Sequence, residues 1–142
     1  MLNKIYGEFE DLYKNAIYVV LSSPSIRFQI GKNSEELAGL LGKHHATTAA
    51  LITACNPKGI KTSEDANQRQ LTDLRVEIES LNLPYYPAYG SNLDESWKEE
   101  SYLVIGLDQT ACIAMSHKYE QNAIVWIDER ETPSLIWMNT LN

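Results

Sequence analysis

Four short segments contain the residues of this chain that are best suited to chemistry; they are 53–57, 87–90, 97–101 and 121–122. Two adjacent carboxylates, Glu99 and Glu100, could exchange protons with a substrate, and an apolar neighbour such as Trp97 would raise the pKa of a carboxyl group toward the useful range. The amides and aromatic rings that could position a substrate are Asn56, Asn67, Tyr89, Trp97, Gln121 and Asn122. This set favours hydrolysis or group transfer on a polar small molecule, nucleotide- or sugar-like, in a cleft at one edge of a sheet.

The elements that must position these segments can be read from the apolar pattern. Continuous apolar runs predict strands at 47–54, 101–107 and 123–127. A shorter strand is expected at 84–89, where prolines favour an edge position or a strand start. After Thr62 and Asp65, which resemble a capping box, apolar residues spaced three and four apart predict a long helix.

The connections between these strands predict their directions. Because a helical crossover joins strands that run the same way, 84–89 should be parallel to 47–54. The connection before 101–107 contains no comparable helix, so that strand should return antiparallel, and 123–127 should keep its direction. All four polar segments would then meet at one edge of the sheet. Asn67 extends the buried face of the long helix toward this edge, and alternation along the strand means that Glu99 and Glu100 cannot both face away from it.

The other predicted elements are a helix over 2–13, a β-hairpin of 16–21 with 26–30, a short helix capped by Asn33 or Ser34, a helix from Asp108 through Tyr119, and a last strand at 135–137. Without repeats or linkers, the chain is expected to be one globular domain spanning 1–142. The fold class expected is α/β (α+β), a single-domain mixed β-sheet with helices packed on it.

Composition limits the partners. The formal charge of −7 disfavours nucleic acid and anionic membrane surfaces, and no apolar run could span a bilayer. The N-terminus lacks a signal-peptide pattern, and the two separate cysteines, Cys55 and Cys112, are typical of a reducing cytoplasm. Neither metal-site spacing nor a cofactor motif is present, so no metal and no cofactor are expected. The sequence does not indicate an oligomeric state.

Several of these segments resemble the bacterial family known as domain of unknown function 3293. The resemblance rests on Thr53–Pro57, Ser63–Asn67, Trp97–Ser101 and Gln121–Ile124, in that order. It implies a self-contained bacterial domain and carries no established activity. Cys55 stands where the family pattern usually has Trp, which implies that Cys55 is not a nucleophile.

Each candidate residue also has a structural interpretation. Asn56 with Pro57 is typical of a turn, Asn67 could hold a loop as a buried polar group, and Gln121 with Asn122 could end a helix. Glu99 and Glu100 could simply be solvated charges. Three functions therefore stay open: an enzyme, a non-catalytic ligand- or protein-binding module that uses the same cleft, and an interaction protein whose acidic surface meets a basic partner.

Overall fold

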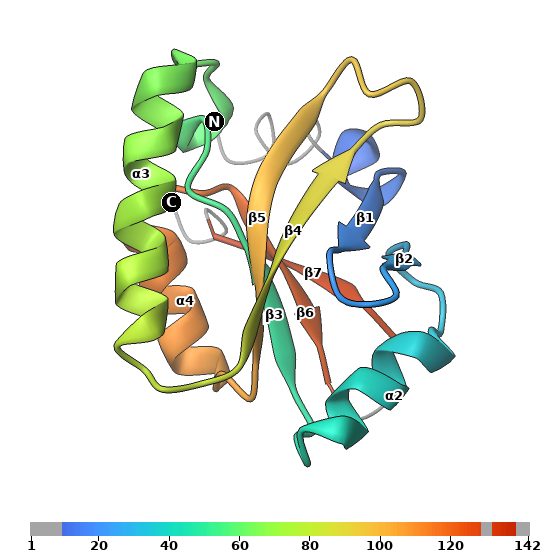
Figure 1. Cartoon of the computed structure of the whole chain (residues 1–142). Helices are drawn as coiled ribbons and strands as arrows, with labels where there is room; N and C mark the ends of the chain where they lie inside the picture. Colours follow the sequence, from blue (N-terminus) through green and yellow to red (C-terminus); the bar gives the residue numbers. More distant parts are fainter. Residues whose placement is uncertain (1–9, 129–131, 139–142) are drawn as a thin grey trace.

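A seven-stranded β-sheet forms the centre of the molecule (Figure 1). The computed structural model describes residues 10–128 and 132–138, and the strands lie in the order β2-β1-β4-β5-β3-β6-β7. The strands are β1 (Ile17–Val20), β2 (Ile26–Phe28), β3 (Ala49–Ile52), β4 (Tyr85–Ser91), β5 (Lys98–Ile105), β6 (Ala123–Ile127) and β7 (Ser134–Trp137). The predicted hairpin of β1 and β2 is confirmed, as are the four strands expected to carry the polar segments.

The helices are α2 (Glu35–Lys43), α3 (Glu64–Glu79) and α4 (Gln109–Lys118), together with a 3-10 turn, η1 (Pro57–Gly59). Residues 10–14 are also helical, whereas the first part of the helix expected over 2–13 lies outside the described residues. Within 10–128 and 132–138, no helix combines the length and the apolar character needed to cross a bilayer.

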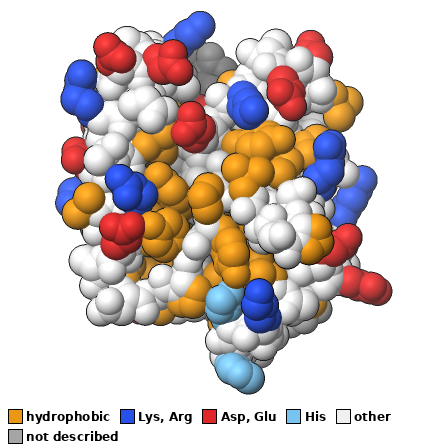
Figure 2. All heavy atoms as spheres, viewed as in Figure 1, with side chains coloured by type: hydrophobic (Ala, Val, Ile, Leu, Met, Phe, Trp, Pro, Cys, Tyr) orange, Lys and Arg blue, Asp and Glu red, His pale blue; other side chains and the backbone are white. Residues whose placement is uncertain are grey.

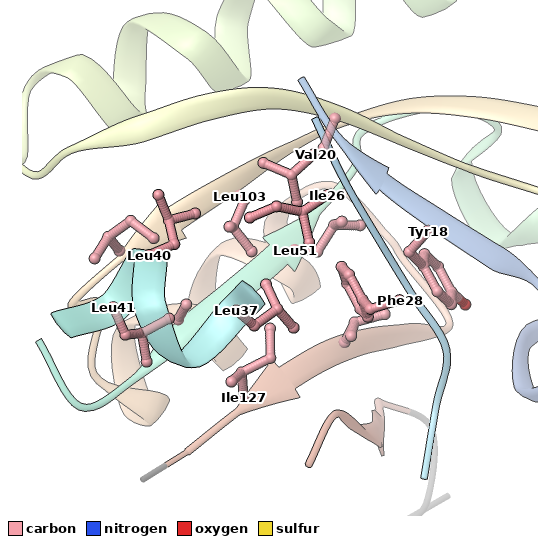
Figure 3. Close-up of a cluster of buried hydrophobic side chains, with 14 of the residues drawn as sticks. Tyr18, Val20, Ile26, Phe28, Leu37, Leu40, Leu41, Leu51, Leu103 and Ile127 are labelled. Atoms are coloured by element: carbon pink, nitrogen blue, oxygen red, sulfur yellow. The ribbon is translucent and has the colours of Figure 1, made fainter. Parts of the chain in front are cut away.

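Side chains that alternate along the strands divide the core into two clusters, one on each face of the sheet. On one face, leucines of α2 pack against β3, β5 and β6, as Figure 3 shows for Leu37, Leu51, Leu103 and Ile127. The opposite face is covered by α3 and α4, which contribute Leu74, Ile78, Cys112 and Met115 (Figure 1). In β5, Leu103 and Val104 belong to opposite clusters, so consecutive residues of this strand point to opposite faces.

The α+β class is confirmed, but the strand pairings correct the expected mixed sheet. Every strand pairing among the described residues is antiparallel. β3 and β4 do run in the same direction, as the crossover by α3 predicts, yet β5 lies between them. The reason is the short β4–β5 connection, which folds β5 back onto β4. The other side of β5 then pairs with β3. Two strands of the same direction therefore never become neighbours.

β4 is an interior strand, although its prolines predicted an edge position or a strand start. The carbonyl of Pro87 accepts a hydrogen bond from the N–H of Leu21 at 2.8 Å, on the side that faces β1. The N–H that proline lacks would point to the same side, where β1 has just ended at Val20. Pro87 therefore removes no hydrogen bond from the β4–β5 ladder.

The helix starts confirm two predictions and correct one. Ser34 caps α2 and Asp108 caps α4, each accepting a hydrogen bond from the N–H three residues further on. Thr62 was expected to cap α3, but the cap is Ser63. Ser63 has the extended backbone of a capping residue, while the hydroxyl of Thr62 donates to the side chain of Asn67 at 2.6 Å. Thr62 thereby belongs to the loop that precedes the helix.

Candidate functional site

The ends of four neighbouring strands bring the polar segments to one edge of the sheet, as their predicted directions require. β3 and β4 end at this edge, and β5 and β6 begin there. In the register, Ile52 pairs with Tyr102 and Gly90 pairs with Glu99. The loop that follows β3 therefore lies beside the start of β5 (Figure 1).

Asn56 turns the chain out of β3 and ties three segments together. Its φ of 48° is left-handed, a conformation that asparagine tolerates better than most residues. Its Oδ1 accepts hydrogen bonds from the N–H of Thr62 at 3.1 Å and from Nδ2 of Asn67 at 3.0 Å. Its own N–H donates to Oδ1 of Asn67 at 2.9 Å. The two amides satisfy each other and the loop, so the structure uses them to build the site.

The amide nitrogen of Asn56 also holds the side chain of Glu99 in place. Nδ2 of Asn56 donates to Oε2 of Glu99 at 3.0 Å, and the indole N–H of Trp97 donates to the same carboxyl group. Burial raises the pKa of Glu99, although the hydrogen bonds from Asn56 and Trp97 act in the opposite direction. Glu99 is thus a half-buried carboxyl group in a fixed position, with a greater tendency to bind a proton than an exposed one.

A cavity of about 640 Å³ lies between the loop after β3, the start of α3 and the β4–β5 connection. Of the predicted site residues, five line it: Asn56, Asn67, Trp97, Glu99 and Glu100. Its volume is in the range of pockets that hold small molecules. Figure 2 shows acidic and basic side chains around this upper part of the molecule.

Glu100 borders the same cavity from the other side of β5. Its side chain is more exposed than that of Glu99, and its Oε2 accepts a hydrogen bond from Nε2 of Gln68 at 3.1 Å. Its backbone carbonyl accepts a hydrogen bond from the hydroxyl of Thr53 at 2.6 Å, which ties the end of β3 to β5. Consecutive strand residues thus border one cavity because the cavity lies at the sheet edge, where both faces are accessible.

Gln121 and Asn122 are buried behind the cavity and do not line it. Nε2 of Gln121 donates to the carbonyls of Cys55 and Tyr119, at 3.0 and 3.1 Å. The carbonyl of Asn122 accepts a hydrogen bond from the N–H of Met138 at 2.8 Å. The contact of Gln121 with Cys55 holds the loop after β3 against the start of β6, and the contact of Asn122 with Met138 ties that start to the residue after β7.

Tyr89 lies in a neighbouring hollow of about 720 Å³ and not in the cavity with Glu99. It pairs with Glu100 across β4 and β5 and shares that residue's face of the sheet. Nζ of Lys98 lies 4.2 Å from the centroid of its ring. Pro87 and Tyr102 line the same hollow.

Tyr13 is a cavity residue that the sequence did not reveal. Its ring centroid lies 6.0 Å from that of Trp97. Burial and, after it, the charge of Glu99 raise the pKa of Tyr13 to about 12. Tyr13 follows the apolar face of the first helical pattern, and nothing in that pattern indicates where the helix packs against the sheet. Thr62 and Gln68 were missed for a related reason, because a loop residue and an exposed helix residue carry no apolar signal.

The described residues contain no group of three or more His, Cys, Asp or Glu side chains that could hold a metal ion. Cys55 borders the cavity, and burial raises the pKa of its thiol to about 11. A thiol with such a pKa stays protonated at neutral pH, and the neutral thiol is a poor nucleophile.

One family model matches the chain, that of "Protein of unknown function (DUF3293)", over residues 52–124. The matched range covers just over half of the chain and runs from the end of β3 to the start of β6. It includes Asn56, Asn67, Trp97, Glu99 and Glu100. No curated protein and no solved structure matches the chain significantly.

Proposed function

The chain belongs to the DUF3293 family of proteins of unknown function, and we propose that it is an enzyme that acts on a polar small molecule in the cavity at this sheet edge. The reaction class is hydrolysis or group transfer, and Glu99 is its acid–base group. The carboxyl of Glu99 carries this proposal, because it borders the cavity, is half-buried and is held by Asn56 at 3.0 Å. The raised pKa of Glu99 brings proton transfer closer to neutral pH.

In this reaction Glu99 takes a proton from the attacking oxygen of water or of a substrate hydroxyl. That oxygen forms the new bond while the bond to the leaving group breaks, and the protonated carboxyl of Glu99 returns its proton to the leaving group. Glu99 ends the cycle in its starting form. Asn56 and Asn67 act as positioning residues, because the amide of Asn56 donates to Glu99 and the amide of Asn67 donates to Asn56. Trp97 provides an apolar wall.

A reducing compartment, the bacterial cytoplasm, is part of the same proposal. Its support is that Cys55 and Cys112 are both unbridged and buried, as cysteines of intracellular proteins commonly are.

A non-catalytic binding module is the second candidate. One observation favours it: Glu99 and Glu100 follow each other in β5 and point to opposite faces, so they do not form a facing acid–base pair. The same cavity would then hold a ligand without turnover.

A thermal-shift screen against sugars, nucleotides and amino-acid derivatives tests for the ligand. A ligand at 100 times its dissociation constant adds about 2.7 kcal/mol to the stability of the folded protein, which is readily detected. Each ligand found is then incubated with the protein, and NMR spectra follow its conversion. The variant Glu99→Gln is compared with Asp73→Asn, which removes one charge from the exposed face of α3.

The enzyme proposal expects turnover at saturating ligand to fall about 10² to 10⁴-fold in Glu99→Gln and to stay unchanged in Asp73→Asn. Full turnover in Glu99→Gln would refute the role of Glu99. Ligands that stabilise the fold without any conversion would establish the binding module instead.

A further inference from the structure

The charges that line the cavity are unbalanced. Carboxylates come from Glu64, Glu95, Glu99 and Glu100, and the cationic groups come from Lys61 and Lys98. Lys98 is already engaged, because its Nζ lies 3.9 Å from Glu95 and sits over the ring of Tyr89 in the neighbouring hollow. Lys61 is exposed and is in no ion pair of the described residues. A surplus of negative charge therefore faces the cavity.

The two central carboxylates are held by neutral donors. Glu99 accepts a hydrogen bond from the amide of Asn56 at 3.0 Å, and Glu100 accepts one from the amide of Gln68 at 3.1 Å. Neither carboxylate is in an ion pair within 10–128 and 132–138. Proteins usually pair a charge that they remove from water, because an unpaired charge is costly to bury. The half-buried Glu99 thus lacks the cation that would compensate it.

The charge of Glu99 also acts on two other groups of the lining, adding to the effect of burial. The pKa of the Tyr13 phenol is raised to about 12, by burial and then by the charge of Glu99. The pKa of the Cys55 thiol is raised to about 11, chiefly by burial and further by the charges of Glu99 and Glu100. A second anion, such as a phosphate group, would meet the same repulsion.

Aromatic rings complete the lining. Trp97 and Tyr13 both border the cavity, with their ring centroids 6.0 Å apart. The faces of such rings attract organic cations, and tryptophan does so most strongly. A metal ion is a poorer fit than an organic cation, because no three potential ligands lie close enough together in the described part of the chain.

We propose that the small molecule bound in this cavity carries an organic cation, such as a protonated amine, which Glu99 receives against the rings of Trp97 and Tyr13, while Glu100 adds negative charge from the other face of β5. This inference rests on the proposed function and narrows its substrate class, since it favours amine-bearing molecules over phosphate-bearing ones. In an amino sugar or an amino-acid derivative, the ammonium group would orient the remainder of the molecule in the cavity.

Calorimetric titration of the full chain at low ionic strength tests the inference with four probes: 1,4-diaminobutane, 1,4-butanediol, succinate and inorganic phosphate. The diamine should bind, and the diol, which has the same carbon chain without charge, should bind about tenfold or more weakly. Succinate and phosphate should not compete. Glu99→Gln should weaken diamine binding about tenfold or more, whereas Asp73→Asn, with the same change in net charge, should leave it unchanged.

The inference fails if the diamine does not bind, if the diol or an anion binds as tightly, or if both variants weaken the diamine equally. Equal weakening would mean attraction by the overall charge of the protein and not by this cavity. These failures are distinguishable from failure of the proposed function. A neutral or anionic ligand that is converted, and whose conversion needs Glu99, would overturn the inference and leave the enzyme proposal intact.

Discussion

The hydrogen bond between Asn56 and Glu99 leads to a prediction that can be tested by replacing a single side-chain nitrogen by oxygen. Asn56→Asp keeps the shape of the side chain and the oxygen that accepts from Thr62 and Asn67. It replaces the Nδ2 group, which lies 3.0 Å from Glu99, by an oxygen. A hydrogen bond is lost and two carboxylates come face to face. We expect this variant to be strongly destabilised at neutral pH and much less so in mild acid.

The expected magnitude follows from two terms. Loss of a hydrogen bond to a charged group costs about 1.5–3 kcal/mol. Repulsion between two unit charges about 4 Å apart amounts to about 4 kcal/mol at the effective dielectric constant of a protein surface. Uptake of a proton by one of the two carboxyls limits this repulsion. We therefore expect the variant to lose about 3–5 kcal/mol of its free energy of unfolding at neutral pH. In mild acid one of the two carboxyls takes up a proton, and the repulsion between two charges disappears.

Urea unfolding at neutral and at mildly acidic pH measures this cost, with tryptophan fluorescence as the signal. The matched control combines Asn56→Asp with Glu99→Gln, which supplies an amide to the introduced carboxylate and should recover about 2 kcal/mol or more. A loss below about 1 kcal/mol at neutral pH, or an equal loss in the Glu99→Gln background, would show that the two side chains do not meet as described.

Three further predictions concern stability. Burial raises the pKa of Glu99 in the folded state, so the stability that Glu99 contributes is complete below its ordinary pKa of 4.5 and is lost as the pH rises through the raised pKa. The stability of Glu99→Gln relative to wild type, measured by urea unfolding, should therefore increase from mildly acidic to neutral pH. A difference that does not change with pH would contradict this. Gly90→Ala would place Cβ 2.9 Å from Cε1 of the buried Tyr18 ring, so its free energy of unfolding, obtained from urea denaturation, should fall by about 1–3 kcal/mol. Ser63→Ala should cost about 1 kcal/mol through loss of the bond to the N–H of Ala66, and an unchanged midpoint would mean that Ser63 is not the cap.

Strand direction is the part of this fold that can be predicted best from the sequence. The long helix α3 can only return the chain parallel to β3, and the short connection after β4 can only reverse it. These two constraints predict that Asn56 and Glu99 lie at the same edge of the sheet, and the pairing of β5 with β3 then makes them neighbours. The apolar face of α3 continues to Asn67, so the second amide could also be assigned to this edge.

The finer placement depends on register and packing, which the apolar pattern does not contain. Tyr89 was expected in the same cleft as Glu99 but borders the neighbouring hollow, because it pairs with Glu100 and shares that residue's face of the sheet. Pro87 looks like an edge residue until the end of β1 beside it is known. Tyr13 joins the site through the packing of residues 10–14 on the sheet, a contact between segments far apart in sequence. Thr62 and Ser63 are both good capping residues, and only the hydrogen bond of Thr62 to Asn67 decides between them.

The role of Glu99 as a compensating anion can be measured directly by a carbon-13 NMR titration of its carboxyl group, assigned by comparison with Glu99→Gln. In the protein alone, the pKa of Glu99 should lie above its ordinary value of 4.5. With 1,4-diaminobutane bound it should fall, because a neighbouring cation favours the ionised carboxylate. A pKa at or below 4.5 in the protein alone, or a raised pKa that the diamine leaves unchanged, would contradict this account of the site.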